Sequence, residues 1–325
     1  MEDNIFENRV DLTALNEQVK KIKSEIGKVI VGQEAMLDLL ITAILADGHV
    51  LIEGVPGVAK TLTAKLLAKI ISVDFSRIQF TPDLMPSDVL GTTVYNLKTS
   101  EFEFKAGPIF SNIVLIDEIN RAPAKTQAAL FEVMEERQVT VDGYTHKMKS
   151  PYMVLATQNP IEQEGTYRLP EAQLDRFLFK IVVNYPTHEE EIDIITRHHE
   201  RKGLSAVSGV NSILSAEQIH AFRQFAQHVH IEKNLLQYIA QIIQETRNNP
   251  MLFLGASPRA SISILMGAKS YAMINGRDFV SPEDIKFIAL PVLRHRLILS
   301  PEKEMEGISA DEVVKQIVDK IEVPR

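Results

Sequence analysis

The segment Gly54-Val55-Pro56-Gly57-Val58-Ala59-Lys60-Thr61 decides the fold prediction for this chain. It follows the apolar run Val50-Leu51-Ile52 and precedes a helical pattern of apolar residues that begins at Leu62. A strand, a loop of small residues, a Lys-Thr pair and a helix form the arrangement that holds the phosphates of a nucleotide, because loop amides and the helix N-terminus point at the anion. The segment from Gly54 to Leu62 is therefore predicted to bind a nucleotide.

Within this segment, Lys60 is predicted to place its charge on the outer phosphates, and the Thr61 hydroxyl is predicted to ligate Mg²⁺. Ala59 stands where the usual pattern has a second glycine. We expect Ala59 to be tolerated there with φ below zero, because alanine is the smallest substitute. The alternative, a tight turn that binds nothing, is not dismissed by this motif alone.

A second segment, Ile113-Val114-Leu115-Ile116-Asp117-Glu118, carries two carboxylates. Its four apolar residues are typical of a strand buried on both faces of a parallel sheet. Asp117 is predicted to hold Mg²⁺, and Glu118 is predicted to orient and polarise the attacking water. An Asp-Glu pair alone is more often a solvated strand end. Downstream of a phosphate loop, it favours an ATP-hydrolysing P-loop protein.

The composition excludes several other classes of protein. The chain has 325 residues, of which 45% are hydrophobic and 24% charged, as in a soluble protein of one large or two medium domains. Cysteine is absent, which excludes disulfides, thiolate metal sites and thiol nucleophiles. The apolar runs are too short for a membrane span, and the acidic opening residues Glu2 and Asp3 do not form a secretory signal. We therefore expect a cytoplasmic protein without membrane insertion.

The net charge of −8 argues against a broad nucleic-acid-binding surface, which needs clustered lysines and arginines. The nearest candidate for a local basic patch is His146-Lys147-Met148-Lys149. The simpler interpretation of this stretch, a solvated hairpin edge, is preferred.

Apolar strand patterns alternate with helical patterns as far as Tyr185, which predicts an α/β fold with a parallel sheet and helices on both of its faces. Two helices, 11–29 and Glu34–Ala46, are predicted before the first strand. The predicted strands are Val50–Glu53, Phe75–Phe80, Ile113–Asp117, Val154–Gln158 and Phe179–Val183.

Two predicted hairpins interrupt the alternation. One joins Thr93–Tyr95 to Glu101–Phe104, and the other joins Gln138–Val141 to Tyr144–Met148 through Asp142-Gly143, a strong hairpin signal. A phosphate-binding core needs neither of them. They are insertions that either reach toward a partner or a central pore, or cover an apolar face.

From Glu189 onward the periodicity is helical only, without convincing strands. We predict a boundary near residue 187, between an α/β core (1–187) and an all-helical lid (188–325). Helix starts are indicated by Ser215, Ser257-Pro258, Ser281-Pro282 and Ser309. The predicted helices are Glu189–Arg201, Ala216–His228, Glu232–Asn248, Pro258–Ile274, Pro282–Leu293 and Ala310–Ile321.

Six motifs in register resemble those of the MoxR-type AAA+ ATPases, from about residue 30 to 300. An alanine before the lysine is usual in that family. The motifs are Gly54–Thr61, Gly107-Pro108-Ile109-Phe110, Asp117-Glu118-Ile119-Asn120-Arg121-Ala122, Ala156-Thr157-Gln158-Asn159-Pro160, Leu169–Phe177 and Ser257-Pro258-Arg259.

The resemblance implies a ring, commonly a hexamer, with ATP and Mg²⁺ bound between neighbouring subunits. In that comparison, Val31-Gly32-Gln33 resembles the segment that lies against the adenine. Asn159 resembles sensor 1, a polar side chain that helps to position the attacking water. The two hairpins match insertions that mark this branch of AAA+ proteins. Preference for ATP over GTP rests on the resemblance alone.

Two arginines carry further implied roles. Arg176 resembles the arginine finger that reaches the ATP of the adjacent subunit, with Arg121 and Arg168 as alternatives that sequence cannot rank. Arg259 resembles the sensor 2 arginine of the lid, and its action in cis or in trans stays open. The simpler alternatives are a surface ion pair of Arg176 with Asp175 or Glu171, and an ordinary first-turn residue for Arg259.

The leading hypothesis is a ring-forming ATPase that couples hydrolysis to remodelling or maturation of a protein client. By resemblance alone, that client or partner carries a von Willebrand factor A-type domain. Three alternatives stay open: a nucleic-acid-dependent motor, a motor subunit of a metal chelatase, and a non-enzymatic nucleotide switch.

Overall fold

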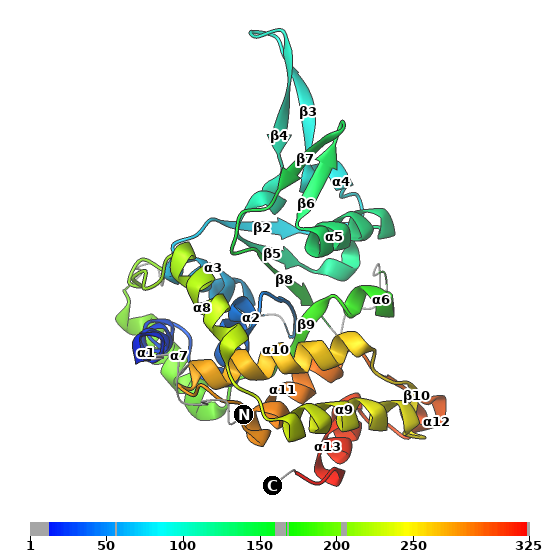
Figure 1. The fold of residues 1–325 in the computed structure, drawn as a ribbon. Coiled ribbons are helices and arrows are strands. Elements are labelled where there is room, and N and C mark those ends of the chain that lie inside the picture. Colours follow the sequence, from blue (N-terminus) through cyan, green and yellow to red (C-terminus); the bar gives the residue numbers. More distant parts are fainter. Residues whose placement is uncertain (1–12, 56, 160–166, 168, 203–206, 324–325) are drawn as a thin grey trace, which may run out of the picture.

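The computed structural model describes residues 13–55, 57–159, 167, 169–202 and 207–323. A five-stranded sheet forms the centre, two hairpins project from one end, and a helical region packs at the other end (Figure 1). The described residues include no helix with the length and apolarity needed to cross a lipid bilayer.

The central sheet is parallel throughout, with strand order β2-β5-β8-β1-β9. Its carboxyl ends therefore all lie at one edge and its amino ends at the other. This confirms the predicted parallel sheet, with strand ends shifted by one or two residues. The strands are β1 (His49–Gly54), β2 (Phe75–Gln79), β5 (Ile113–Asp117), β8 (Met153–Gln158) and β9 (Phe177–Val183).

Strand β5 shows why these residues form a central strand. All five of its residues are buried. Ile113 and Leu115 belong to the apolar core on one face of the sheet, and Val114 and Ile116 belong to the core on the other. This alternation follows from the two-residue period of a strand, and it requires apolar residues at every position.

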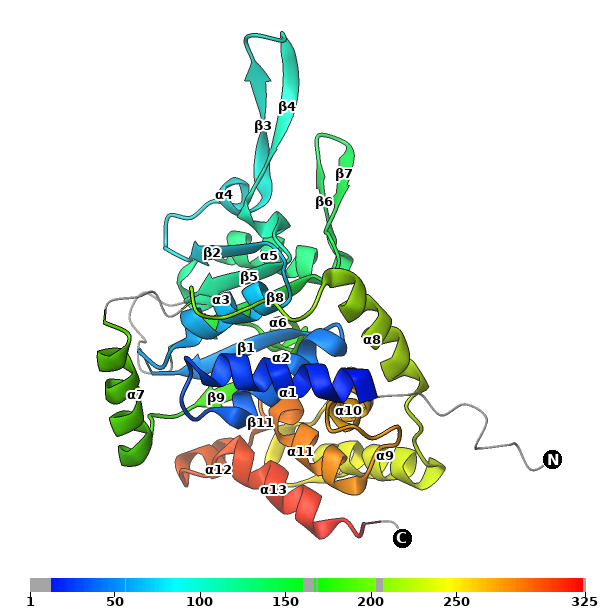
Figure 2. The same ribbon diagram turned by 90° about the vertical axis from the view of Figure 1, so that its left-hand side faces the viewer.

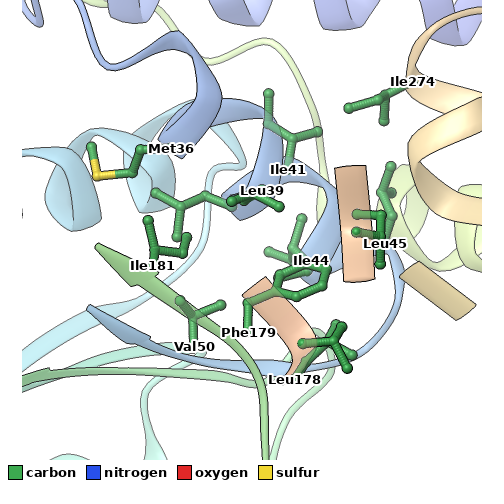
Figure 3. Packing of buried hydrophobic residues seen from close by; sticks show 14 of the residues in the cluster. Met36, Leu39, Ile41, Ile44, Leu45, Val50, Leu178, Phe179, Ile181 and Ile274 are labelled. Carbon is green, nitrogen blue, oxygen red and sulfur yellow. The ribbon is translucent and has the colours of Figure 1, made fainter. Parts of the chain in front are cut away.

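Helices cover both faces of the sheet. Helix α2 has nine buried residues, and Leu39 and Ile44 lie beside Phe179 and Ile181 of β9 (Figure 3). The other face is covered by α5, whose Leu130 and Phe131 belong to the second core. The helices of this part are α1 (Thr13–Gly27), α2 (Glu34–Leu45), α3 (Lys60–Ile70), α4 (Pro86–Leu90), α5 (Ala124–Glu136) and α6 (Glu171–Leu174), with short 3₁₀ helices η1 (Pro108–Phe110) and η2 (Ile119–Arg121).

Two antiparallel hairpins project from the sheet, β3–β4 (Gly91–Asn96 and Glu101–Ala106) and β6–β7 (Gln138–Val141 and Tyr144–Lys147) (Figures 1 and 2). Both were predicted. Asp142 and Gly143 adopt φ of 50° and 82°, the left-handed pair that a two-residue hairpin turn requires.

Aromatic side chains join the two hairpins. The Phe104 ring of β4 stacks on the His146 ring of β7, with centroids 4.1 Å apart. Phe110 meets both rings edge-on. Since an isolated two-stranded hairpin is only marginally stable in water, this cluster holds each hairpin against the other. The predicted solvated edge at His146 is therefore wrong for this residue, because its ring covers an aromatic neighbour.

The C-terminal part consists mainly of helices, and the predicted starts at Ser215, Ser257, Ser281 and Ser309 are confirmed. Each of these serines is the N-cap residue of the helix that follows. The helices are α7 (His188–Glu200), α8 (Ala216–His228), α9 (Lys233–Asn248), α10 (Pro258–Ile274), α11 (Pro282–Leu293), α12 (Pro301–Met305) and α13 (Ala310–Lys320).

One part of the C-terminal prediction is wrong. The region contains a small antiparallel sheet of β10 (Leu252–Leu254) and β11 (Ile298–Leu299), so it is not all-helical. Segments of two and three residues are too short to show a period-2 pattern, which is why the sequence did not reveal them. The domain boundary near residue 187 stays a prediction.

His49 is a buried histidine that ties the start of β1 to its surroundings. Its Nε2 donates to the carbonyl oxygen of Met134, and its Nδ1 accepts from the backbone N–H of Val154, each at 3.0 Å. Burial, together with the nearby charge of Arg137, lowers the pKa of His49 to about 3. The folded chain therefore holds this ring neutral.

Acidification is expected to destabilise the fold through His49. The folded-state pKa lies below the ordinary histidine value of 6.5, so the stability from the neutral ring is complete above pH 6.5 and is lost as pH falls toward 3. The free energy of unfolding should lose about 1.4 kcal/mol per pH unit from this residue over that range. Urea unfolding of the wild type and of His49→Gln at pH 7.5 and 5.5 measures the difference in slope. Equal slopes would contradict the assignment.

Candidate phosphate-binding site and its two edges

The predicted phosphate-binding loop connects β1 to α3, and Lys60 is the first residue of α3. Lys60 Nζ donates a hydrogen bond to the Gly54 carbonyl oxygen at 2.6 Å. Val55 and Leu62 pack against the apolar core, so they fix the loop and the helix behind it. Gly57 adopts φ of 88°. Pro56 lies outside the described residues.

Ala59 was expected to keep φ below zero. This expectation is wrong, because Ala59 adopts φ of 57°. The turn from the loop into α3 needs a left-handed residue, and an L-residue with a Cβ pays about 1–2 kcal/mol there. The Ala59 carbonyl oxygen accepts from the N–H of Thr63 at 2.9 Å and from its hydroxyl at 3.0 Å. These bonds hold the strained residue in place.

The two carboxylates lie at the carboxyl end of β5. Asp117 is the last residue of the strand and is buried, and Glu118 follows it with φ of 58°. Thr157 of the neighbouring strand β8 links them. Its hydroxyl accepts from the Glu118 N–H and donates to Asp117 Oδ1, both at 3.1 Å.

Three residues that the sequence analysis did not assign to this site contact the carboxylates. Arg77 Nε lies 2.5 Å from Asp117 Oδ2. Gln79 Nε2 donates to Glu118 Oε2 at 2.8 Å, and Arg121 Nε lies 3.1 Å from the same oxygen. Arg77 and Gln79 share one face of β2, as residues two apart do in a strand. The missing signal was the sheet order, because the sequence does not say that β2 lies beside β5.

Lys60 and Asn159 lie at the same edge of the sheet as the carboxylates. Burial lowers the pKa of Lys60, while the charges of Asp117, Glu118 and Glu53 oppose that shift. Asn159 follows the last residue of β8 directly and is half-buried. The predicted loop, carboxylates and sensor 1 residue are therefore brought to one edge.

A pocket of about 540 Å³ lies beside the loop, between α2, the end of β9, α11 and α13. Val31, Met36 and Leu39 line one side, and Tyr185 and Leu290 line another. Its wall is mostly apolar, which suits a flat aromatic base. Val31 and Gln33 were expected here from the sequence, whereas the other wall residues were not, since they are far apart in the chain.

The pocket adjoins the phosphate-binding loop directly. Gln33, another wall residue, donates from Nε2 to the Val58 carbonyl oxygen at 3.4 Å. Val183, also in the wall, pairs with Gly54. Gly32 adopts φ of 65°, a left-handed conformation that favours glycine, and it lies beside the Glu190 carboxylate of α7. Gly32 lines a neighbouring pocket rather than this one.

The donor set fits a magnesium ion. Mg²⁺ in nucleotide sites takes one or two protein oxygens and completes its shell with phosphate oxygens and water. The Thr61 hydroxyl and the Asp117 carboxylate are hard oxygen donors of this kind. Arg77 supplies the positive partner of the buried Asp117 carboxylate in this structure, which offsets the cost of burying a charge.

Arg176 lies at the opposite edge of the sheet. It directly precedes β9, whose first residue Phe177 pairs with His49, whereas its last residue Val183 pairs with Gly54. Seven residues of extended strand span about 20 Å. Arg176 and the phosphate-binding loop of the same chain are therefore separated by the full length of a strand.

Arg259 of α10 lies with Arg176 at this amino edge. Arg176 Nη1 donates to the Phe131 carbonyl oxygen at 2.7 Å and lies 3.2 Å from Glu135 Oε2. Arg259 Nη2 lies 2.8 Å from Glu135 Oε1. The two arginines thus share one carboxylate. The simple pairing of Arg176 with Asp175 is wrong, because Asp175 pairs with Arg296.

The other two finger candidates differ in position. Arg121 contacts Glu118 of its own chain, at the carboxyl edge of the sheet. Arg168 lies outside the described residues. Among the candidates that the structure describes, Arg176 is the one at the edge that faces away from its own loop.

Comparisons with known proteins agree with this geometry. Residues 49–179 match the family described as ATPase family associated with various cellular activities (AAA), and residues 244–317 match the AAA lid domain. The chain is similar to Chaperone MoxR1 of Mycobacterium tuberculosis, with 44% identity over 93% of this chain and 81% of that protein.

Two further relatives cover nearly the whole chain. The uncharacterized protein YeaC of Bacillus subtilis is 47% identical over 94% of each chain. A crystal structure of a protein from Cytophaga hutchinsonii is 43% identical, with a TM-score of 0.90 over 97% of each chain.

Replacing Ala59 by glycine tests the strain in the loop. Ala59→Gly should raise the free energy of unfolding by about 1 kcal/mol, because glycine adopts a left-handed conformation without the Cβ clash. Thermal unfolding of the variant and the wild type measures this. Ala68→Gly, in the middle of α3, is the matched control and should destabilise instead. A loss of stability in Ala59→Gly would contradict the assignment of strain.

Proposed function

Because the chain belongs to the MoxR family of AAA+ ATPases, we propose that it works as a ring, expected to be a hexamer, that couples Mg²⁺-dependent ATP hydrolysis to the remodelling or maturation of a protein client. The main observation in favour of a ring is that Lys60 and Glu118 lie at one end of the strands, whereas Arg176 and Arg259 lie at the other end. Each chain holds both halves of a site but cannot bring them together. A head-to-tail neighbour joins them.

The proposed reaction is phosphoryl transfer from ATP to water. Loop amides and Lys60 hold the phosphates, and the wall around Val31 receives the base. Glu118 polarises the attacking water, and Asn159 helps to position it. Thr61 and Asp117 would hold Mg²⁺, which would supply positive charge that offsets the charge of the phosphates.

The neighbour's Arg176 supplies positive charge to the γ-phosphate in the transition state. A finger of this kind contributes about 10³–10⁵ in rate. The position of Arg259 beside Arg176, on the same Glu135, favours action in trans for both arginines.

Glu118 must change partners before it can act. In this structure Gln79 and Arg121 both donate to Glu118 Oε2. These two donors occupy the oxygen that would otherwise accept a hydrogen bond from the attacking water. Release of this oxygen therefore accompanies the catalytic state, and Lys60 must exchange Gly54 for phosphate in the same way.

The projecting hairpins are the proposed client-contacting elements. They expose the apolar side chains Tyr95, Leu97, Phe102 and Tyr144. Exposed aromatic groups on a projecting element suit contact with a polypeptide. Nucleotide binding and release would shift the hairpins together through the Phe104–His146 stack.

A von Willebrand factor A-type domain on the client or partner stays part of the proposal, on the family resemblance alone. We place the reaction in the cytoplasm, where ATP is supplied.

The nucleic-acid motor is the weaker alternative. A basic surface is required to neutralise phosphates. The hairpins instead carry nearly balanced charges, namely Lys98, Lys105, Lys147 and Lys149 against Glu101, Glu103 and Asp142. No described contact favours a metal-chelatase role over protein remodelling.

Glu118→Gln tests the hydrolytic function. The variant should lower kcat by about 10²–10⁴-fold while retaining ATP binding, because the amide cannot accept the proton of water. Purification of the tagged variant with ATP and Mg²⁺ should yield a ring carrying a defined protein, with Lys60→Ala as the control that loses both. Hydrolysis at the normal rate would contradict the mechanism, and recovered nucleic acid would favour the motor alternative.

Subunit mixing tests the shared site. Arg176→Ala and Glu118→Gln are each expected to be inactive alone. At equal amounts about a quarter of the interfaces should combine an intact loop side with an intact arginine, since each position is filled correctly half of the time. Steady-state ATPase assays of the mixture should recover a corresponding activity. A mixture as inactive as its components would contradict a site shared between chains.

A further inference from the structure

Arg296, just after α11, is a buried arginine whose hydrogen-bonding capacity is fully engaged at the start of β9. Its side chain is 2% exposed. Nε donates to Asp175 Oδ1 at 2.6 Å, and Nη2 donates to the Asp175 carbonyl oxygen at 3.1 Å. The remaining acceptors are the carbonyl oxygens of Phe177, Leu178 and Val292 and the hydroxyl of Ser263.

Arg296 contacts the residues directly before and after Arg176 in the sequence. Arg296 holds the residue before Arg176 by both side chain and backbone, and it holds the two residues after Arg176 by their backbones. The backbone that carries the Arg176 side chain is therefore fixed on both sides by one guanidinium group.

The same contacts reach Arg259. The second carboxylate oxygen of Asp175, Oδ2, accepts from Ser257 Oγ at 3.1 Å. Ser257 is the N-cap residue of α10 and lies two residues before Arg259. Asp175 thus connects the segment that bears Arg176 to the helix end that bears Arg259, and Arg296 is buried behind it.

We propose that Arg296, acting through Asp175, is a positioning residue that sets Arg176 and Arg259 in the joint geometry needed to complete a neighbour's ATP site. The inference rests on the proposed shared site. Arg296 itself touches no nucleotide-binding residue in the described part of the chain.

Simple stabilisation accounts poorly for this arrangement. A buried ion pair is weak evidence for stability, because the cost of removing two charges from water offsets their attraction. Burial does lower the pKa of Arg296, with Asp175 opposing the shift. What the planar guanidinium supplies is direction, since its rigid fork fixes several acceptors at once.

Arg296→Lys tests the role. Lysine keeps the charge but offers three donors on a flexible stem, so it cannot hold all of these acceptors. We expect kcat to fall by about 10²-fold, the usual cost of a misplacement near 1 Å. ATP affinity, measured with a fluorescent nucleotide, should stay unchanged, because the chain's own loop lies at the other edge of the sheet.

Mixing Arg296→Lys subunits with Glu118→Gln subunits distinguishes misplaced arginines from a general loss of structure. Arg296→Lys retains an intact Lys60 and Glu118, so Glu118→Gln subunits should restore its activity by supplying correctly placed arginines. A general structural defect would not be restored. Arg277→Lys is the matched control, because Arg277 donates from both Nη atoms to the buried carboxylate of Asp284 and lies beyond the opposite end of α10 from Arg259. It should leave kcat unchanged.

Ser257→Ala keeps the test decisive if Arg296→Lys fails to fold. The Ser257 hydroxyl makes no cap bond to α10, so its loss removes only the hydrogen bond to Asp175, and the variant should still fold. It should still lower kcat and be restored by Glu118→Gln. Normal kcat in this variant and in a folded Arg296→Lys, or loss without restoration, would overturn the inference.

The Arg176→Ala and Glu118→Gln mixture distinguishes the two levels of failure. If that mixture recovers activity while Arg296→Lys does not, the shared site stands and the positioning role falls. If neither mixture recovers, the shared site itself is wrong, and the role of Arg296 falls with it.

Discussion

The shared direction of all five sheet strands is the constraint on which the chemistry of this chain depends. Because the strands are parallel, the phosphate-binding loop and the carboxylates that follow β5 must lie at one edge. The same constraint sends Arg176, which precedes β9, to the other edge. In the proposed mechanism, the ATPase site is thereby divided into two halves at opposite ends of the strands, and assembly of copies would join them.

Much of the fold was predictable because its signals are local. Apolar runs such as Ile113–Ile116 indicate a buried strand. Asp142-Gly143 specifies the turn of the β6–β7 hairpin, and the serine N-caps mark the starts of helices. The phosphate-binding loop and the Asp117–Glu118 pair were predictable for the same reason. Each is a short segment whose function depends on its own residues and on the strand directly before it.

The remainder depends on which segments lie side by side, and no local pattern records that. Gln79 and Arg77 reach the carboxylates only because β2 is the neighbour of β5. Arg296 reaches Asp175 across 121 residues of chain. Backbone strain was also missed: Ala59 and Glu118 are left-handed because tertiary contacts force them, against their own preference. Strands β10 and β11 are too short to show the alternation of apolar and polar residues by which a strand is predicted.

The stacked rings of Phe104 and His146 have a mechanical consequence. Helix α5 leads through Arg137 into β6, and the Met148 N–H donates to the Arg137 carbonyl oxygen, so the base of the second hairpin is clamped to the end of this helix. Glu135, two residues before Arg137, is the carboxylate that Arg176 and Arg259 share. The hairpins and the end of α5 are therefore mechanically connected. In the proposed ring, a load at the hairpin tips would reach Glu135 and the two arginines that are proposed to face the next subunit.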